Sequence, residues 1–187
     1  MKTLKILSGV IVSLVLILIG IYAFYGGFTN VKCTIAEQGG ETLVYKEIKG
    51  DYSQSGDVMN KMYYALINDN KIETFKGFGI YYDNPQKVEK SKLRSEVGCI
   101  LEPVDTVKVF WLKGKYSIKV CPIKKYIVTE FPHKGNMSII VSIMKVYPAL
   151  NKYMEEIGYE QNVPVMEIYD MPNKKILYRA EAIKISK

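Results

Sequence analysis

One carboxylate in the sequence lies in a segment that predicts a buried strand. Glu167 belongs to the run Val163-Pro164-Val165-Met166-Glu167-Ile168-Tyr169, in which successive side chains alternate between the two faces of an extended chain. A buried carboxylate is costly unless a cation or hydrogen-bond donors meet it. Glu167 is therefore a candidate ligand-binding group. The alternative is that it pairs with a nearby lysine or arginine on a solvated sheet face.

The alternation in this strand also predicts which face is which. Met166 and Ile168 share one face, and Glu167 and Tyr169 share the other. We expect the apolar face to pack against helices and the face of Glu167 to line a groove.

The composition argues against nucleic-acid and metal binding. The chain has 187 residues and a net charge of +7, but its lysines are scattered among acids and form no Arg-rich stripe. Cys33, Cys99 and Cys121 form no C-x-x-C pair, and the single histidine, His133, does not complete a zinc site with them. We expect no metal and no cofactor. Whether Cys99 and Cys121 form a disulfide is left open by the sequence.

The N-terminal segment predicts a membrane anchor. No charged residue occurs between Ile6 and Val31, a run longer than the roughly 20 residues that span a bilayer. We expect an uncleaved signal anchor at 1–30 that crosses the membrane through 6–28, a linker at 31–40 and a domain at 41–187; a cleaved signal is the alternative. Lys2 and Lys5 predict a cytoplasmic N-terminus and a domain on the non-cytoplasmic side.

Hydrophobic periodicity predicts an α+β domain. Helices are expected at 56–68 and 138–157, with Pro148 kinking the second or starting a fresh turn in it. Gly98 is a candidate bulge, and the segment 107–112, which holds Trp111, is a short strand or a connection. Strands are expected at 41–49, 77–82, 92–102, 116–120, 126–131, 163–169 and 176–185.

The two halves of the domain repeat each other. Lys49-Gly50 and Lys134-Gly135 each precede a helix and are about 85 residues apart; Tyr82-Asp83-Asn84-Pro85 and Tyr169-Asp170-Met171-Pro172 recur at nearly the same offset. Each half reads strand, helix, strand, strand. Pairing two such halves predicts one curved antiparallel sheet with both helices on one face.

These motifs together resemble the GyrI-like small-molecule-binding domain, also called the AraC or bacterial transcription activator effector-binding domain. The resemblance covers about residues 39–185, with a membrane helix where many relatives carry a DNA-binding domain. It implies a pocket with a strand glutamate, here Glu167, and aromatic neighbours. The candidate ligand-binding residues are Glu167, Tyr126, Phe131, Tyr178, Tyr169, Tyr63 and Trp111.

An acid among aromatic rings suits an organic cation, since cation–π contacts contribute about 0.5–2 kcal/mol each. We therefore expect a membrane-anchored module that binds a small hydrophobic or cationic molecule. One alternative is a protein–protein interaction module. Another is a hydrolase of reactive toxins, as in some GyrI-like relatives, in which Glu167 activates a water and Tyr126 or Tyr178 donates a proton to the leaving group.

Overall fold

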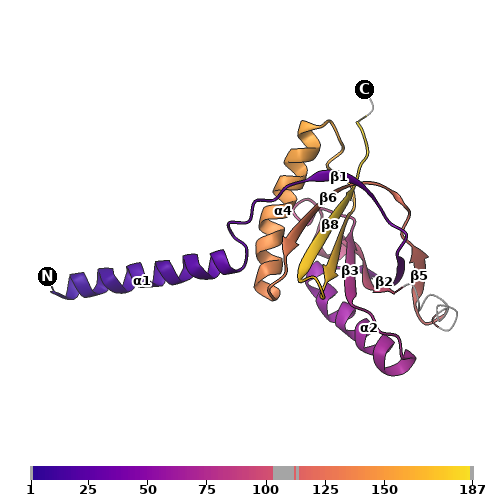
Figure 1. The fold of residues 1–187 in the computed structure, drawn as a ribbon, viewed down its shortest axis with the longest axis horizontal. Coiled ribbons are helices and arrows are strands. Elements are labelled where there is room, and N and C mark those ends of the chain that lie inside the picture. The colour runs from indigo at the N-terminus through magenta and orange to yellow at the C-terminus, as the bar shows by residue number, and fades with distance from the viewer. Residues whose placement is uncertain (1, 103–111, 113, 186–187) are drawn as a thin grey trace.

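The structure, a computed structural model, describes residues 2–102, 112 and 114–185. Trp111 and most of the expected segment at 107–112 lie outside these residues. Figure 1 shows a long N-terminal helix projecting from a domain built on one sheet. The helices are α1 (Lys2–Phe24), α2 (Ser55–Asn70) and α4 (Asn136–Glu156), with 3₁₀ turns η1 (Tyr52–Gln54) and η2 (Lys90–Lys92). The strands are β1 (Thr34–Gln38), β2 (Thr42–Lys49), β3 (Lys76–Tyr81), β4 (Arg94–Leu101), β5 (Ser117–Val120), β6 (Lys124–Pro132), β7 (Val165–Asp170) and β8 (Lys175–Glu181).

The sheet has the two-fold repeat that the sequence predicts. Its eight strands are ordered β1-β6-β8-β7-β3-β4-β2-β5, and each neighbouring pair is antiparallel. One half is β2-α2-β3-β4 and the other is β6-α4-β7-β8, with β3 and β7 paired at the centre. The predicted α+β fold is confirmed.

The two outer strands are exchanged between the halves. β1 leads into β2 but pairs with β6, whereas β5 leads into β6 but pairs with β2. The two connections therefore cross over the sheet, where the Gly40 amide donates to the Cys121 carbonyl (2.7 Å) and the Cys121 amide donates to the Glu41 carbonyl (2.8 Å). Residues 34–38, expected to be a linker, are thus part of the sheet.

The two helices of the domain, α2 and α4, pack on one face of the sheet, which we call the helix face. α4 covers a core that includes Ile127, Tyr178 and Val165, and α2 covers a second core that includes Val44 and Cys99. The opposite face carries a third core with Met166, Ile168 and Cys121.

The expected assignment of the faces of β7 is therefore wrong. Met166 and Ile168 lie under the crossing connections, and Glu167 lies on the helix face. Apolarity indicates burial, but it does not tell whether a helix or a connection covers the strand.

The expectation of a bulge at Gly98 is also corrected. Gly98 lies in an unbroken ladder between Tyr45 and Phe78, with no bulge; a Cβ there would lie 1.9 Å from the Val44 carbonyl oxygen. Pro148 lies inside α4, which continues to Glu156, and the kink stays a prediction. The sequence left the pairing of Cys99 and Cys121 open; both are unbonded, because they belong to cores on opposite faces of the sheet.

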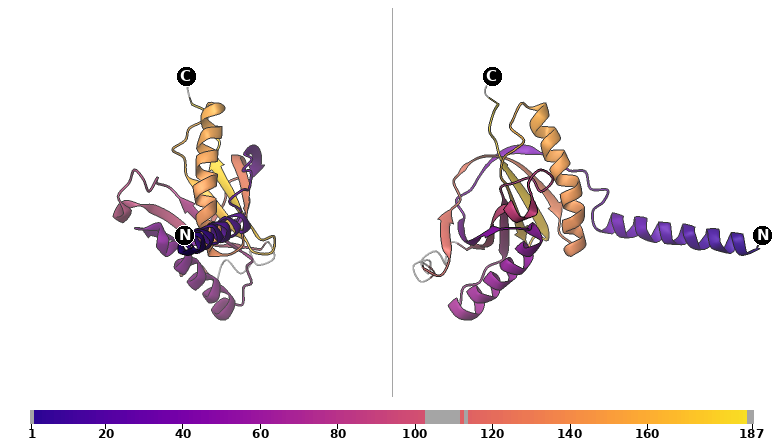
Figure 2. Two further views of the ribbon diagram at one scale, coloured as in Figure 1. Left: turned by 90° about the vertical axis from the view of Figure 1, so that its left-hand side faces the viewer. Right: turned by 180° about the vertical axis from the view of Figure 1, so that it is seen from behind.

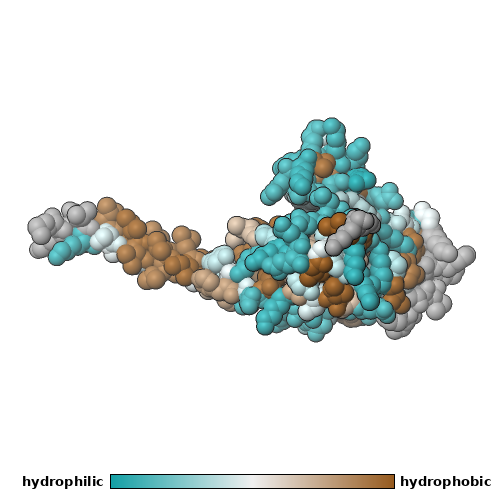
Figure 3. All heavy atoms as spheres, turned by 90° about the horizontal axis from the view of Figure 1, so that it is seen from above, coloured by the Kyte–Doolittle hydropathy of each residue, from teal (hydrophilic) through white to brown (hydrophobic). Residues whose placement is uncertain are grey.

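The segment Lys5–Phe24 of α1 has the length and apolarity of a membrane span, properties that signal sequences share. Figure 3 shows it as a hydrophobic rod projecting from a more hydrophilic domain. Its C-terminal end is attached to the domain: Lys134 Nζ donates to the Phe24 carbonyl (2.8 Å), and Lys145 Nζ donates to the Gly27 carbonyl.

Candidate functional site

Glu167 lies at the centre of the sheet, under the helix face. Only 2% of its surface is exposed. The Tyr147 hydroxyl, from α4, donates to Oε1 (2.8 Å), and the Tyr169 hydroxyl, from the same strand as Glu167, donates to Oε2 (2.6 Å). Each carboxylate oxygen thus has one phenolic donor.

The surroundings of Glu167 supply hydroxyl groups but no positive charge. Among the described residues, no lysine, arginine or histidine forms an ion pair with it. Burial raises the pKa of Glu167, and the hydrogen bonds from Tyr169 and Tyr147 offset this only in part. Burial and then the charge of Glu167 raise the pKa of Tyr169 and Tyr147, so both hydroxyls remain protonated donors.

Two residues on the neighbouring strands complete the surroundings of the acid. Tyr178 on β8 and Gly79 on β3 are the direct register partners of Glu167. The Tyr178 hydroxyl shares a 2.6 Å hydrogen bond with Ser142 Oγ of α4, and its ring meets the Tyr147 ring edge to face at 6.1 Å. Gly79 has no side chain, and the Tyr81 hydroxyl fills that space, 2.7 Å from where a Cβ would lie.

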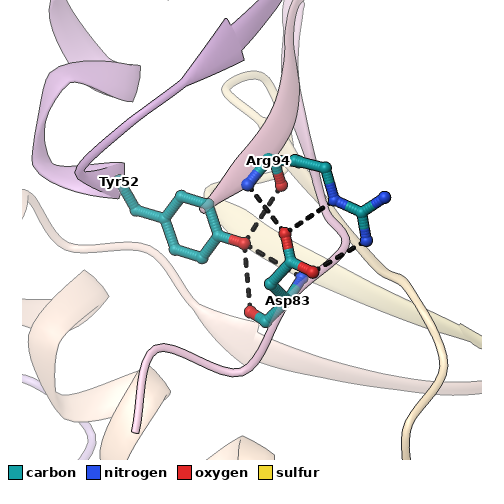
Figure 4. A network of polar contacts seen from close by, with 3 residues as sticks. All are labelled: Tyr52, Asp83 and Arg94. Atoms are coloured by element: carbon teal, nitrogen blue, oxygen red, sulfur yellow. Dashed lines mark hydrogen bonds and ion pairs between the residues drawn. The ribbon is translucent and has the colours of Figure 1, made fainter. Parts of the chain in front are cut away.

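Tyr81 packs against Tyr52, which belongs to a polar network with Asp83 and Arg94 at the end of β3 (Figure 4). Its ring packs at 4.8 Å against the ring of Tyr52, whose hydroxyl donates to the carbonyl of Asp83 or of Arg94, each at 3.0 Å. Asp83 Oδ2 accepts from Arg94 Nε (3.0 Å) and Oδ1 accepts from Arg94 Nη2 (2.8 Å). The first Tyr-Asp-x-Pro motif therefore closes the β3–β4 connection beside the site.

The structure brings together only some of the predicted site residues. Tyr169 and Tyr178 adjoin Glu167. Phe131 lies on the helix face but packs in the α4 core and against Gly26. Tyr126 lies on the opposite face, where its hydroxyl donates to the Pro122 carbonyl (3.0 Å).

Two further predicted residues lack a demonstrated contact with the acid. Tyr63 is on α2, is 37% exposed and contacts the Tyr64 ring. Trp111 lies outside the described residues.

Tyr147 and Tyr81 were not among the site residues predicted from the sequence. A weak signal for Tyr147 exists, since it is the polar-tipped aromatic that immediately precedes Pro148 in an otherwise apolar stretch of helix. Which strand residue it meets depends on the placement of α4, which the helical period does not encode.

A metal centre has no support in this part of the molecule. Within the described residues, no three His, Cys, Asp or Glu side chains are grouped so that they could hold a metal ion.

Comparison with known families identifies the domain. Residues 32–181 match the model of the GyrI-like small molecule binding domain. The chain belongs to the GyrI-like family. The match begins shortly after α1 and ends with β8, so this GyrI-like domain includes the exchanged strand β1.

Solved structures share the GyrI-like fold at low identity. The C-terminal domain of EcmrR has a TM-score of 0.58 and 12% identity, with 83% of this chain and 99% of that chain covered. EcmrR in a complex with DNA has a TM-score of 0.59 and 15% identity, with 97% of this chain and 70% of that chain covered. SAV2435 bound to tetraphenylphosphonium has a TM-score of 0.55 and 11% identity, with 81% of this chain and 93% of that chain covered.

Two mammalian proteins are similar in sequence. Human testis-expressed protein 264 is 28% identical over 163 residues, which are 81% of this chain and 50% of that protein. Its mouse homolog is 29% identical over 121 residues, which are 62% of this chain and 37% of that protein. The chain thus spans half or less of the length of these relatives.

Proposed function

We propose that this GyrI-like domain binds a lipophilic organic cation whose charge pairs with Glu167. The observation that carries the proposal is a buried carboxylate with two phenolic donors and no cationic partner among the described residues. Such an acid is either protonated or requires a cationic partner to be charged. Tyr147, Tyr169 and Tyr178 add aromatic surface around it, which suits a cation with apolar substituents.

Entry of a ligand requires a rearrangement, because Glu167 is closed off in this structure. The side chain best placed to move is Tyr147, since it reaches the acid from α4 and is itself only partly buried. Tyr169 and Tyr178 belong to the sheet. We infer that Tyr147 swings away, with or without α4, and that the cation takes its place against Oε1.

The ligand of the structural neighbour supports the chemistry. SAV2435 was solved with tetraphenylphosphonium, a cation whose charge is surrounded by four phenyl groups. We extend this ligand class to the present chain because its buried acid, Glu167, has the aromatic rings of Tyr147, Tyr169 and Tyr178 around it.

The anchor is the second part of the proposal. α1 would hold the domain at a membrane, with residues 1–30 as an uncleaved anchor, the N-terminus in the cytoplasm and the domain on the other side. A tethered domain would meet lipophilic cations where they concentrate, at the bilayer surface.

The test is a binding titration of the full chain in detergent with tetraphenylphosphonium, repeated with neutral triphenylphosphine oxide. We expect binding of the cation only. Glu167→Gln keeps the shape and removes the charge, so it should weaken binding at least about tenfold, or about 1.4 kcal/mol.

Glu130→Gln is the matched control, because Glu130 is a surface partner of Lys175. Equal affinity in Glu167→Gln and the parent chain would refute the role of Glu167. Catalytic release of product from a reactive electrophile would favour the hydrolase alternative, and no binding of any small molecule would favour a protein partner.

A further inference from the structure

α4 exposes an apolar stripe along its first half. Met137, Ile140, Ile143 and Met144 are 46%, 52%, 46% and 70% exposed. The opposite side of the same turns packs in the domain core. We call these four residues the α4 stripe; a soluble surface helix normally carries polar residues at such positions.

The stripe adjoins the end of α1. Lys134, just before α4, and Lys145, just after the stripe, hold the carbonyl groups of Phe24 and Gly27. Phe24 and Phe28 are 59% and 69% exposed at this junction. In the views of Figures 1 and 2, α4 is the part of the domain on the side from which α1 projects, and it runs across the end of α1.

The charge around the stripe has one sign. Between residues 131 and 154 the sequence has three lysines, Lys134, Lys145 and Lys152, and no aspartate or glutamate. Helices that lie in a membrane interface combine an apolar face with flanking lysines, whose ammonium groups reach the headgroups.

We propose that the α4 stripe lies in the headgroup region of the bilayer that α1 spans. This rests on the membrane anchoring proposed above. If α1 crosses the bilayer, its C-terminal end lies at the membrane surface, and the two lysine contacts bring the stripe to the same depth. The occupant of the stripe is then lipid, and the domain is held against the membrane at two places.

The contact has a consequence for the site. α4 also carries Tyr147, which covers Glu167, one turn beyond Ile143 and Met144. A lipid-bound α4 places the residue that closes the site next to the phase in which a lipophilic cation partitions.

The experiment is quenching of tryptophan fluorescence by brominated phospholipids in nanodiscs that hold the full chain. Met144→Trp reports on the stripe and Ile17→Trp on α1. Val120→Trp, on β5 at the far end of the domain (Figure 1), is the matched control, being apolar and 63% exposed. All three positions are exposed, so the fold should tolerate the change, and the emission of native Trp111 is subtracted using the parent chain.

We expect bromination to lower the emission of Trp at 144 and at 17 by about twofold or more and to leave Trp at 120 unchanged. Quenching at 17 without quenching at 144 would overturn the stripe contact and leave the anchor standing. Equal quenching at 144 and 120 would overturn it as well, because lipid would then bind the domain without preference. No quenching at 17 would refute the anchor and, with it, this inference.

Discussion

The Tyr147 hydroxyl of α4 donates a 2.8 Å hydrogen bond to Oε1 of Glu167 on β7. This bond joins the helix layer to the centre of the sheet, between residues that are 20 positions apart. It also closes the buried carboxylate off from solvent. The stability of the domain and access to the proposed site therefore depend on the same contact.

Tyr147→Phe should destabilise the protein by about 1–2 kcal/mol near neutral pH, because it leaves Oε1 of a buried acid without a donor. Chemical denaturation of the full chain in detergent measures the change. Tyr64→Phe is the control, since Tyr64 is 60% exposed on α2. A loss no larger than that of the control would mean that the hydrogen bond contributes nothing.

The stability contributed by Glu167 should fall as the pH rises. Burial raises its pKa above the ordinary value of 4.5, so the folded state holds this proton more tightly than the unfolded state does. The contribution is fully present below about pH 4.5 and is lost as the pH rises through the folded pKa. Glu167→Gln removes the titration.

The measurement is therefore the difference in free energy of unfolding between Glu167→Gln and the parent chain, taken from pH 4 to 8. We expect the variant to gain relative stability as the pH rises. A constant difference over this range would contradict a raised pKa. For the proposed cation the dependence is reversed, since binding needs the charged acid, so affinity should increase with pH.

Gly98→Ala should destabilise the domain by about 3 kcal/mol, because the added methyl would meet the Val44 carbonyl oxygen of the paired strand at 1.9 Å, and backbone in a sheet yields little. Gly56→Ala is the control: nothing lies within 4 Å of a Cβ there, and in α2 the change should stabilise by about 0.5–1 kcal/mol. Thermal unfolding of both variants tests the contrast; similar melting temperatures would show that β4 can shift.

Gly79→Ala should weaken cation binding while costing less stability than Gly98→Ala. The added methyl would lie 2.7 Å from the Tyr81 hydroxyl, the end of a side chain that can turn aside. The displaced ring would then crowd the space beside Glu167. The titration with tetraphenylphosphonium measures the effect, and unchanged affinity would mean that the ligand does not reach this part of β3.

Glu41→Ala should cost about 3 kcal/mol, because it leaves Arg179 buried without its carboxylate. Arg179 Nη2 donates to Glu41 Oε1 (2.7 Å), and its Nε and Nη1 are buried without a partner in the described structure. Glu130→Ala, at an exposed ion pair with Lys175, should cost less than about 1 kcal/mol. Chemical denaturation measures the loss in free energy of unfolding for each variant. Equal losses would show that the Arg179–Glu41 pair is no stronger than a surface pair.

The pH dependence of Glu41 has the opposite sign to that of Glu167. Burial alone would raise the pKa of Glu41, but the hydrogen bond and charge of Arg179 lower it below 4.5. Its contribution is present above that pH and is lost as the pH falls through the lowered pKa. The sign differs because the partly buried Glu41 has a cationic partner, whereas the buried Glu167 has only hydroxyl donors.

Local patterns in the sequence determined much of this protein. The apolar run of α1, the repeated strand-helix-strand-strand order and the turn motifs at Tyr82-Asp83-Asn84-Pro85 and Tyr169-Asp170-Met171-Pro172 were readable because each depends on neighbours in the chain. Glu167 stood out for the same reason, as an acid in an apolar strand.

Only the tertiary structure decided what surrounds that acid. The exchange of β1 and β5 rests on pairings between distant strands, and the crossing connections, rather than the helices, cover Met166 and Ile168. The same long-range packing brings Tyr147 over Glu167 and sends Tyr126 to the other face. Alternation along a strand tells which residues share a face, but which layer covers that face is determined by contacts between segments far apart in the chain.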